Sequence, residues 1–237
     1  MDQSSNTQLS GDDLNLKRLE SLSIETFDND IFDLSIRLPV GILTELRISS
    51  LEWNKLTALL NRQLNIKKLK LTLLTDKAIV TDIFDKLQLE SLELDALKMS
   101  SKMIATILSK LPILKSLILS EIVVNERVMN NVGDLSELET LTIDVTNIPV
   151  TSFENIRKLK RLKDLELQFS DRQSTSGAEI LKTLAQSDNA SLVKLSLVGF
   201  SYSTYDIIST KSVDHIAALA KSAPHLKKFK IIRTCFL

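Results

Sequence analysis

Apolar residues recur along this chain in a six-residue frame, leucine-x-x-leucine-x-leucine, in which isoleucine or phenylalanine also fills the apolar positions. The frame occurs nine times, and successive copies begin 24, 23, 23, 25, 24, 24, 30 and 34 residues apart. The copies are LESLSI from Leu19, LTELRI from Leu43, IKKLKL from Ile66, LESLEL from Leu89, LKSLIL from Leu114, LETLTI from Leu138, LKDLEL from Leu162, LVKLSL from Leu192 and LKKFKI from Leu226. Nine matches at nearly constant spacing indicate an internal repeat rather than chance.

Within each repeat, two periodicities alternate. Every frame ends in apolar–polar alternation, as in Leu92-Glu93-Leu94, which is typical of a short strand with one buried face. Segments 76–87 and 102–112 instead carry apolar residues at helical spacing. The spacing of Thr151 and Glu154 fits a capping box, which predicts a helix start just before segment 154–159. Strand–helix units of constant length stack into a right-handed solenoid with one parallel sheet on the inside.

The frames, together with helix ends of the form proline-x-leucine in LPILKSLIL and APHLKKFKI, resemble those of leucine-rich repeat proteins. The closest likeness is to the cytosolic class that includes ribonuclease-inhibitor-like and F-box leucine-rich proteins. The resemblance covers Leu19 to Ile231. It implies an α/β horseshoe of about nine repeats, with the parallel sheet on the concave face and short helices on the convex face.

One feature departs from that family, whose pattern continues with an asparagine or cysteine after each strand. Here those positions hold Phe27, Leu51, Leu74, Leu97, Ile122, Thr146, Ser170, Phe200 and Thr234. We therefore expect irregular turns that are closed by apolar packing. Segment 38–53 is also too short to form an F-box, and the second repeat already uses its leucines.

Composition and charge limit the expected partners and the expected compartment. The chain of 237 residues is 43% hydrophobic and 25% charged, with 30 basic and 30 acidic side chains, so net charge favours neither nucleic acid nor an anionic membrane. A single cysteine, Cys235, excludes an internal disulfide and suggests a reducing compartment, with the cytoplasm first and the nucleus second. We expect a disordered tail over residues 1–13 and one leucine-rich-repeat domain over residues 14–237. Nothing in the pattern bears on oligomeric state.

Residues that carry catalysis are scarce. There are two histidines, neither in a metal-binding spacing, and the five glycines form no phosphate loop. We therefore expect a protein that is not an enzyme and binds no metal or cofactor. The cations of Arg157–Lys163 are compatible with a nuclear-import or polyanion patch, or with a helix end followed by a solvated strand edge.

Two surfaces are candidates for a protein partner. The first is the concave sheet face, where strand alternation directs Asp144, Asp164, Glu166 and Lys194 outward. Charges of alternating sign could instead simply solvate the strands. No row of aromatic residues lines this face, so we expect no nucleic-acid partner.

The second candidate surface is the rim after the two longest repeats. We expect their extra residues to form neighbouring loops over Gln168–Glu179 and Val198–Ser212. The second loop holds Phe200, Tyr202 and Tyr205, which are suited to a binding hot spot, or which could pack the loop down.

The function expected from these features is a non-enzymatic protein-interaction module that binds a protein through the concave face and the C-terminal rim. The resemblance implies a substrate-recognition or adaptor subunit of a ubiquitin-ligase-type complex. The alternative is a regulator, either an activator or an inhibitor, of an enzyme such as a GTPase, acting through the charged concave face.

Overall fold

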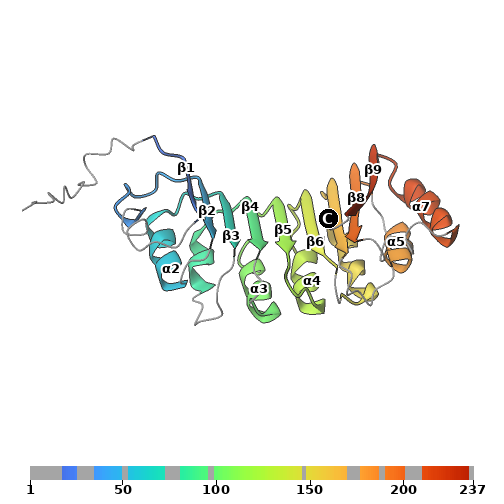
Figure 1. Ribbon diagram of the computed structural model, residues 1–237, viewed down its shortest axis with the longest axis horizontal. Coiled ribbons are helices and arrows are strands. Elements are labelled where there is room, and N and C mark those ends of the chain that lie inside the picture. The colour runs from blue at the N-terminus through green and yellow to red at the C-terminus, as the bar shows by residue number, and fades with distance from the viewer. Residues whose placement is uncertain are drawn as a thin grey trace, which may run out of the picture.

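A single sheet of nine parallel strands dominates the computed structural model, and the strands lie in the order of the sequence from β1 to β9 (Figure 1). The structure describes residues 18–25, 35–49, 53–72, 81–95, 99–145, 148–169, 177–186, 190–200 and 210–234. The strands are β1 Ser21–Ile24, β2 Glu45–Ser49, β3 Lys68–Thr72, β4 Ser91–Asp95, β5 Ser116–Ser120, β6 Thr140–Asp144, β7 Asp164–Phe169, β8 Lys194–Phe200 and β9 Lys228–Thr234. Each strand begins at the third position of one frame, as the alternation predicts.

The register of the sheet repeats from one strand to the next. Leu46 of β2 lies opposite Leu69 of β3, which in turn lies opposite Leu92 of β4. The fourth frame position is matched in the same way through β9. Because a slip of one residue would turn every frame leucine to the solvent face, burial fixes this register.

The core is the stack of frame residues. All three apolar frame positions are buried in each copy from the second to the eighth, between Leu43 and Leu197. Burying one such side chain contributes about 1.5–3 kcal/mol. The first and last copies are less covered: Leu22 and Phe229 are half-buried, and Ile231 keeps 36% of its surface exposed.

Helices cover the side of the sheet away from the concave surface, which is the lower side in Figure 1. They are α2 Trp53–Arg62, α3 Ser101–Leu108, α4 Glu126–Gly133, α5 Gly177–Ala185 and α7 Thr210–Ser222, with the 3₁₀ helices η1 Thr81–Lys86 and η2 Val150–Lys158. The helical pattern of segment 102–112 is confirmed by α3. In segment 76–87 the described residues form η1, whose tighter 3₁₀ winding the apolar spacing did not predict.

The predicted capping box at Thr151 is wrong. The cap position of η2 is Pro149, with φ −59° and ψ 135°, and no side chain caps the helix there. The helix therefore starts at Val150, one residue before Thr151, so the Thr151 hydroxyl lies inside the first turn. Proline suits the start of a helix because its φ is fixed and it has no N–H to leave unpaired.

A buried glutamine joins the second repeat to its own helix. Gln63 is fully buried; its Nε2 donates to the carbonyl of Pro39 at 2.8 Å, and its Oε1 accepts from the backbone N–H of Leu43 at 3.2 Å. Asn65 adds a bond of 2.6 Å to the carbonyl of Gly41, whose φ of 70° is the left-handed conformation that glycine adopts readily. Side chains thus satisfy backbone groups where the chain turns into β2.

The two longest repeats keep their strand pairing beyond the predicted loop starts. Gln168 and Phe169 continue β7, and Val198–Phe200 continue β8, with Val198 opposite Ile232 and Phe200 opposite Thr234. The prediction that the second loop begins at Val198 is therefore wrong, because β9 supplies a hydrogen-bonding neighbour for three further residues. α7 likewise begins at Thr210, inside the predicted loop.

Candidate functional site

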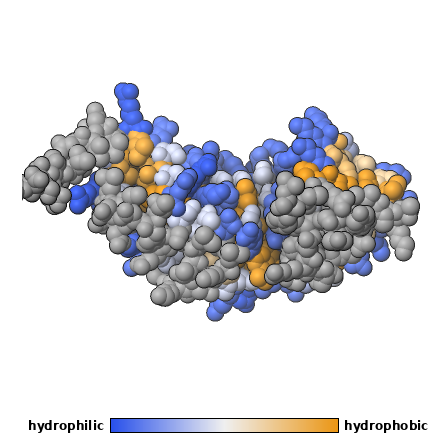
Figure 2. All heavy atoms as spheres, viewed as in Figure 1, coloured by the Kyte–Doolittle hydropathy of each residue, from blue (hydrophilic) through white to orange (hydrophobic). Residues whose placement is uncertain are grey.

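The outward-facing side chains of the sheet form a continuous polar surface on the concave side of the solenoid. Figure 2 shows this side hollowed in the middle of the molecule and largely hydrophilic there. Three outward positions per strand contribute, and most of these side chains are half-buried between their neighbours. A small hollow of about 80 Å³ lies among Arg47, Lys68, Lys70 and Glu93.

Acidic residues gather in the middle of this surface. Among the outward positions of β4, β5, β6 and β7, five are aspartate or glutamate and none is lysine or arginine. We call these positions the acidic centre; its carboxylates are Glu93, Asp95, Asp144, Asp164 and Glu166. Apart from Asp144 at the end of β6, the outward positions of β5 and β6 are Ser116, Ile118, Ser120, Thr140 and Thr142. The middle of the concave face is therefore a floor of short side chains with carboxylates on both sides.

Cations lie on the strands that flank the acidic centre. We call them the basic ends: Lys68 and Lys70 of β3 on one side, and Lys194, Lys228 and Lys230 of β8 and β9 on the other. Two ion pairs join the zones, Lys70–Glu93 at 2.6 Å and Lys194–Asp164 at 2.9 Å. Both pairs are between residues directly opposite in the sheet register.

Several charges of the concave face stay unpaired. In the part of the chain that the structure describes, Lys68, Asp95, Glu166, Lys228 and Lys230 take part in no ion pair, although Glu166 accepts a bond of 3.1 Å from Gln168 Nε2. A carboxylate that is half-buried and unpaired on a sheet has lost part of its hydration without a charged partner. These groups are available to charges brought by another molecule.

The edge of the sheet where the strands begin is organised differently. Its residues just before the strands, which we call the amino edge, alternate in sign: Lys67, Glu90, Lys115, Glu139 and Lys163. Glu90 pairs with Lys67 at 3.3 Å and with Lys115 at 2.8 Å, and Glu139 pairs with Lys163 at 2.8 Å. Each backbone carbonyl of this edge also accepts two N–H groups of the next repeat, as the Glu90 carbonyl does from Lys115 and Ser116.

The amino-edge pairs shift the titration of their members. Hydrogen bonds from Lys115 and Lys67 hold the pKa of Glu90 below its usual value, and the bond from Lys163 does the same for the pKa of Glu139. The bond to Glu90 raises the pKa of Lys115 above that of an ordinary lysine. Each shift favours the charged form, and the side chains remain solvated at the edge.

Replacing Glu90 tests this edge. A lowered carboxylate pKa means that the stabilisation is complete above the unfolded value, roughly 4.3, and is lost as pH falls through the folded value. The raised pKa of Lys115 has the opposite pH dependence. The stabilisation that Lys115 contributes is complete below about pH 10.4 and is lost as the pH rises further. We expect Glu90→Gln to lower Tm by about 1–3 °C at pH 7 and low salt, and by nothing measurable at pH 3 or in 1 M NaCl.

The matched control for that experiment is Glu154→Gln, because Glu154 has no ion pair among the described residues. It should melt like the parent protein at every pH. A Glu90→Gln deficit that persisted undiminished at pH 3 would contradict the electrostatic origin.

Some of the predicted site residues lie among the described residues, and others do not. Asp144, Asp164, Glu166 and Lys194 all face outward on the concave surface, and Asp164 and Lys194 are brought together as a pair. Phe200 ends β8. Tyr202 and Tyr205, residues 170–176 of the first predicted loop, and Cys235 lie outside the described residues.

Alternation directs Asp95 to the concave face as well, although the predicted set of binding residues did not include it. Asp95 occupies the last outward position of β4, as Asp144 does in β6. The sequence also gave no indication of which carboxylates would be paired. Pairing depends on what lies opposite: Glu93 faces Lys70, whereas Asp95 faces Thr72 on one side and Ser120 on the other.

Apolar side chains reach the surface near the C-terminal end of the solenoid. Ile232 of β9 is 40% exposed and lies opposite Val198 of β8, so the two share the concave face beside the lysines of that basic end. Val213 of α7 is 61% exposed. Figure 2 shows apolar residues at the surface in this region.

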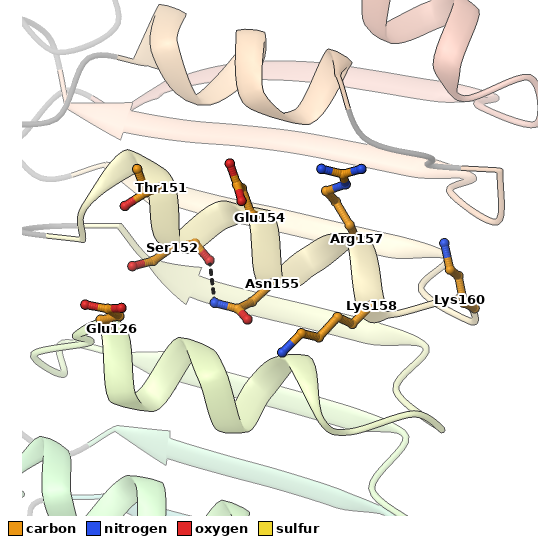
Figure 3. A pocket seen from close by; sticks show the side chains of 8 residues that line it. All are labelled: Glu126, Thr151, Ser152, Glu154, Asn155, Arg157, Lys158 and Lys160. Carbon is orange, nitrogen blue, oxygen red and sulfur yellow. Dashed lines mark hydrogen bonds between the residues drawn. The ribbon is translucent and has the colours of Figure 1, made fainter.

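A second hollow, open and about 640 Å³ in volume, lies on the convex side over α4 and η2 (Figure 3). Arg157 and Glu154 point away from α4, whereas Lys158 extends toward it and approaches Asp134 at 3.6 Å. Of the basic run from Arg157 to Lys163, Lys158, Arg161 and Lys163 each pair with an acid of the preceding repeat. This arrangement favours the helix-end and strand-edge interpretation over a polyanion patch.

Within the described ranges, no group of three or more histidine, cysteine, aspartate or glutamate side chains is arranged to hold a metal ion. The helices in those ranges are all too short or too polar to cross a bilayer.

Repeat length, strand order, register and buried frame leucines together define an α/β leucine-rich-repeat solenoid. No protein-family model matches the sequence, and a search of curated proteins finds no match. Among solved structures, a chain of the "Crystal structure of TLR13-ssRNA13 complex" aligns with 13% identity and a TM-score of 0.33. The alignment covers 84% of this chain and 40% of the TLR13 chain.

Proposed function

We propose that this protein is a non-enzymatic interaction module that captures a protein partner on the concave face of its sheet. The observation that carries the proposal is the floor of short side chains on β5 and β6, bordered by the carboxylates of β4 and β7. A partner can approach the backbone closely at that floor, while charged groups at its borders fix orientation and speed association. Helices occupy the opposite side of the sheet.

A matched pair of threonine replacements tests the location of binding. Thr142 lies half-buried at the floor on β6, whereas Thr106 lies on α3 on the convex side. Thr142→Tyr fills the floor with a side chain that strands accept readily, and should reduce partner capture at least about tenfold. Thr106→Tyr should leave capture unchanged. The measurement is affinity capture from a lysate with quantitative mass spectrometry, followed by a titration with the purified partner.

The melts of both variants serve as the folding control. Equal capture by the parent protein and a folded Thr142→Tyr variant would contradict the concave-face proposal. Loss of capture by Thr106→Tyr alone would move the site to the convex side.

Two finer roles are proposals that the same capture experiment separates. The resemblance to F-box leucine-rich proteins supports a substrate-recognition or adaptor role, which requires ubiquitin-ligase subunits among the captured proteins. The enzyme-regulator role, with a GTPase as the example, is favoured by the unpaired Glu166 in the acidic centre. It requires an enzyme whose activity changes on binding, and whose response is lost when Asp164 and Glu166 are reversed in charge.

A further inference from the structure

Two surfaces of the same sheet distribute their charges in opposite ways. Along the amino edge the sign changes at every repeat from Lys67 to Lys163. Glu90 pairs with a lysine of each adjacent repeat, and Glu139 pairs with Lys163 of the next repeat. On the concave face the signs are segregated over several repeats. A surface that only needed solvation could alternate in the same way, because opposite charges on neighbouring strands support one another.

The segregation leaves charge uncompensated in each zone. The acidic centre has five carboxylates over four strands. Glu93 and Asp164 at its borders each pair with a lysine, whereas Asp95 and Glu166 take part in no ion pair among the described residues. At one basic end Lys68 has no ion pair, and at the other Lys228 and Lys230 have none among the described residues. Across the face, the unpaired charges therefore run positive, negative, positive.

From this order we infer that the partner is a protein whose docking segment carries cations in its middle and carboxylates toward both ends. The inference rests on the proposed function, because it names the chemistry of the molecule that the concave face captures. Opposite charges placed on all three zones would relieve the unpaired groups together, and such complementarity selects partners and sets their register.

A second copy of this chain does not fit the same face. Two concave faces set against each other, in either direction, place acidic centre against acidic centre and basic end against basic end. Like charges at close range cost free energy, so the pattern disfavours self-association through this face. The partner is a different chain.

The width of the face sets the length of the docking segment. Neighbouring strands lie about 4.8 Å apart, so the seven strands from β3 to β9 span roughly 34 Å and the four strands of the acidic centre roughly 19 Å. An extended chain advances about 3.3 Å per residue, which corresponds to about ten residues in all and six over the centre. A twelve-residue extended peptide that crosses the strands can therefore contact all three zones.

Two synthetic peptides of identical composition provide the test. One has three glutamates, six lysines and three glutamates in that order; the other has three lysines, six glutamates and three lysines. Both are neutral in their side chains, so net charge cannot distinguish them. We expect the full chain to bind the first peptide at least about tenfold more tightly at low ionic strength, measured by fluorescence anisotropy, with binding lost in 0.5 M NaCl.

Charge-reversed variants locate that binding. Asp95→Lys with Glu166→Lys should weaken binding of the lysine-centred peptide about tenfold, because two unpaired carboxylates become cations. The matched control is Glu126→Lys with Glu154→Lys on the convex side, which changes net charge by the same amount and should have little effect.

Equal affinity for the two peptides, or binding of neither, overturns the inference about the partner's charge order. So does equal weakening by the concave and convex variants. None of these outcomes tests whether the partner binds on the concave face. The comparison of Thr142→Tyr with Thr106→Tyr decides that question.

Discussion

Phe153→Ala is expected to lower the free energy of unfolding by about 3–5 kcal/mol. Phe153 lies on η2, which packs between α4 and α5, and its side chain is fully buried. Removing the ring leaves a cavity that three packed helices cannot close without breaking their own contacts. Urea unfolding followed by far-UV circular dichroism measures the change.

The control for Phe153 is Val123→Ala, because Val123 is 62% exposed. It should change the unfolding free energy by less than about 0.5 kcal/mol. A loss of under about 1 kcal/mol for Phe153→Ala would contradict the packing of η2 between α4 and α5.

Trp53→Ala is expected to cost about as much, roughly 3–5 kcal/mol, at the other end of the solenoid. Trp53 begins α2, keeps 4% of its surface exposed and stacks on the fully buried Phe84, with ring centroids 6.3 Å apart at 29°. Such ring pairs add about 0.5–1.5 kcal/mol beyond burial. The contact joins the second repeat to the third.

Trp53→Phe separates packing from hydrogen bonding at the same position. The buried indole Nε1 of Trp53 has no hydrogen-bond partner among the described residues. Phenylalanine retains a ring against Phe84 and removes an N–H whose burial without a partner costs about 1–3 kcal/mol. The variant should therefore lose less than half of what Trp53→Ala loses, again in urea unfolding. An equal loss would mean that the indole N–H is satisfied.

The strands and their register followed from the sequence, because each frame has three apolar positions that must meet the same core. The helices followed less well. Whether a segment winds as an α-helix or a 3₁₀ helix depends on the room its neighbours leave. At Gly133 an added Cβ would lie 3.0 Å from both the Cβ and the carbonyl oxygen of Asn155, so α4 and η2 are in close contact. A spacing of apolar residues does not show such a contact.

The sequence pattern also did not predict which polar side chains are buried. Gln63 has no apolar character and lies at a helix end, where exposure is the usual outcome. Gln63 is buried because the chain turns beside it, where the carbonyl of Pro39 and the N–H of Leu43 need hydrogen-bond partners. These backbone groups lie about one repeat earlier in the chain, so the sequence around Gln63 does not reveal them.

On the concave face, alternation predicted which residues face outward, including Asp144, Asp164, Glu166 and Lys194. The same alternation gave the order of basic, acidic and basic outward positions along the sheet, but it did not predict which of these charges form ion pairs. Whether Lys194 neutralises Asp164 depends on the register between β7 and β8, which are separated by the second-longest repeat. It also depends on the reach of the lysine side chain. The aromatic rim residues Tyr202 and Tyr205 remain a sequence-based prediction.

The alternating amino edge also constrains how a solenoid of this kind can change its length. Deleting the single repeat that carries Lys115 would bring Glu90 beside Glu139, two carboxylates where each now has a lysine. Deleting that repeat together with the one that carries Glu139 would instead bring Glu90 beside Lys163, and the alternation would survive. Losing or duplicating repeats in pairs along this stretch therefore keeps opposite charges side by side at the edge, whereas losing or gaining a single repeat places like charges together.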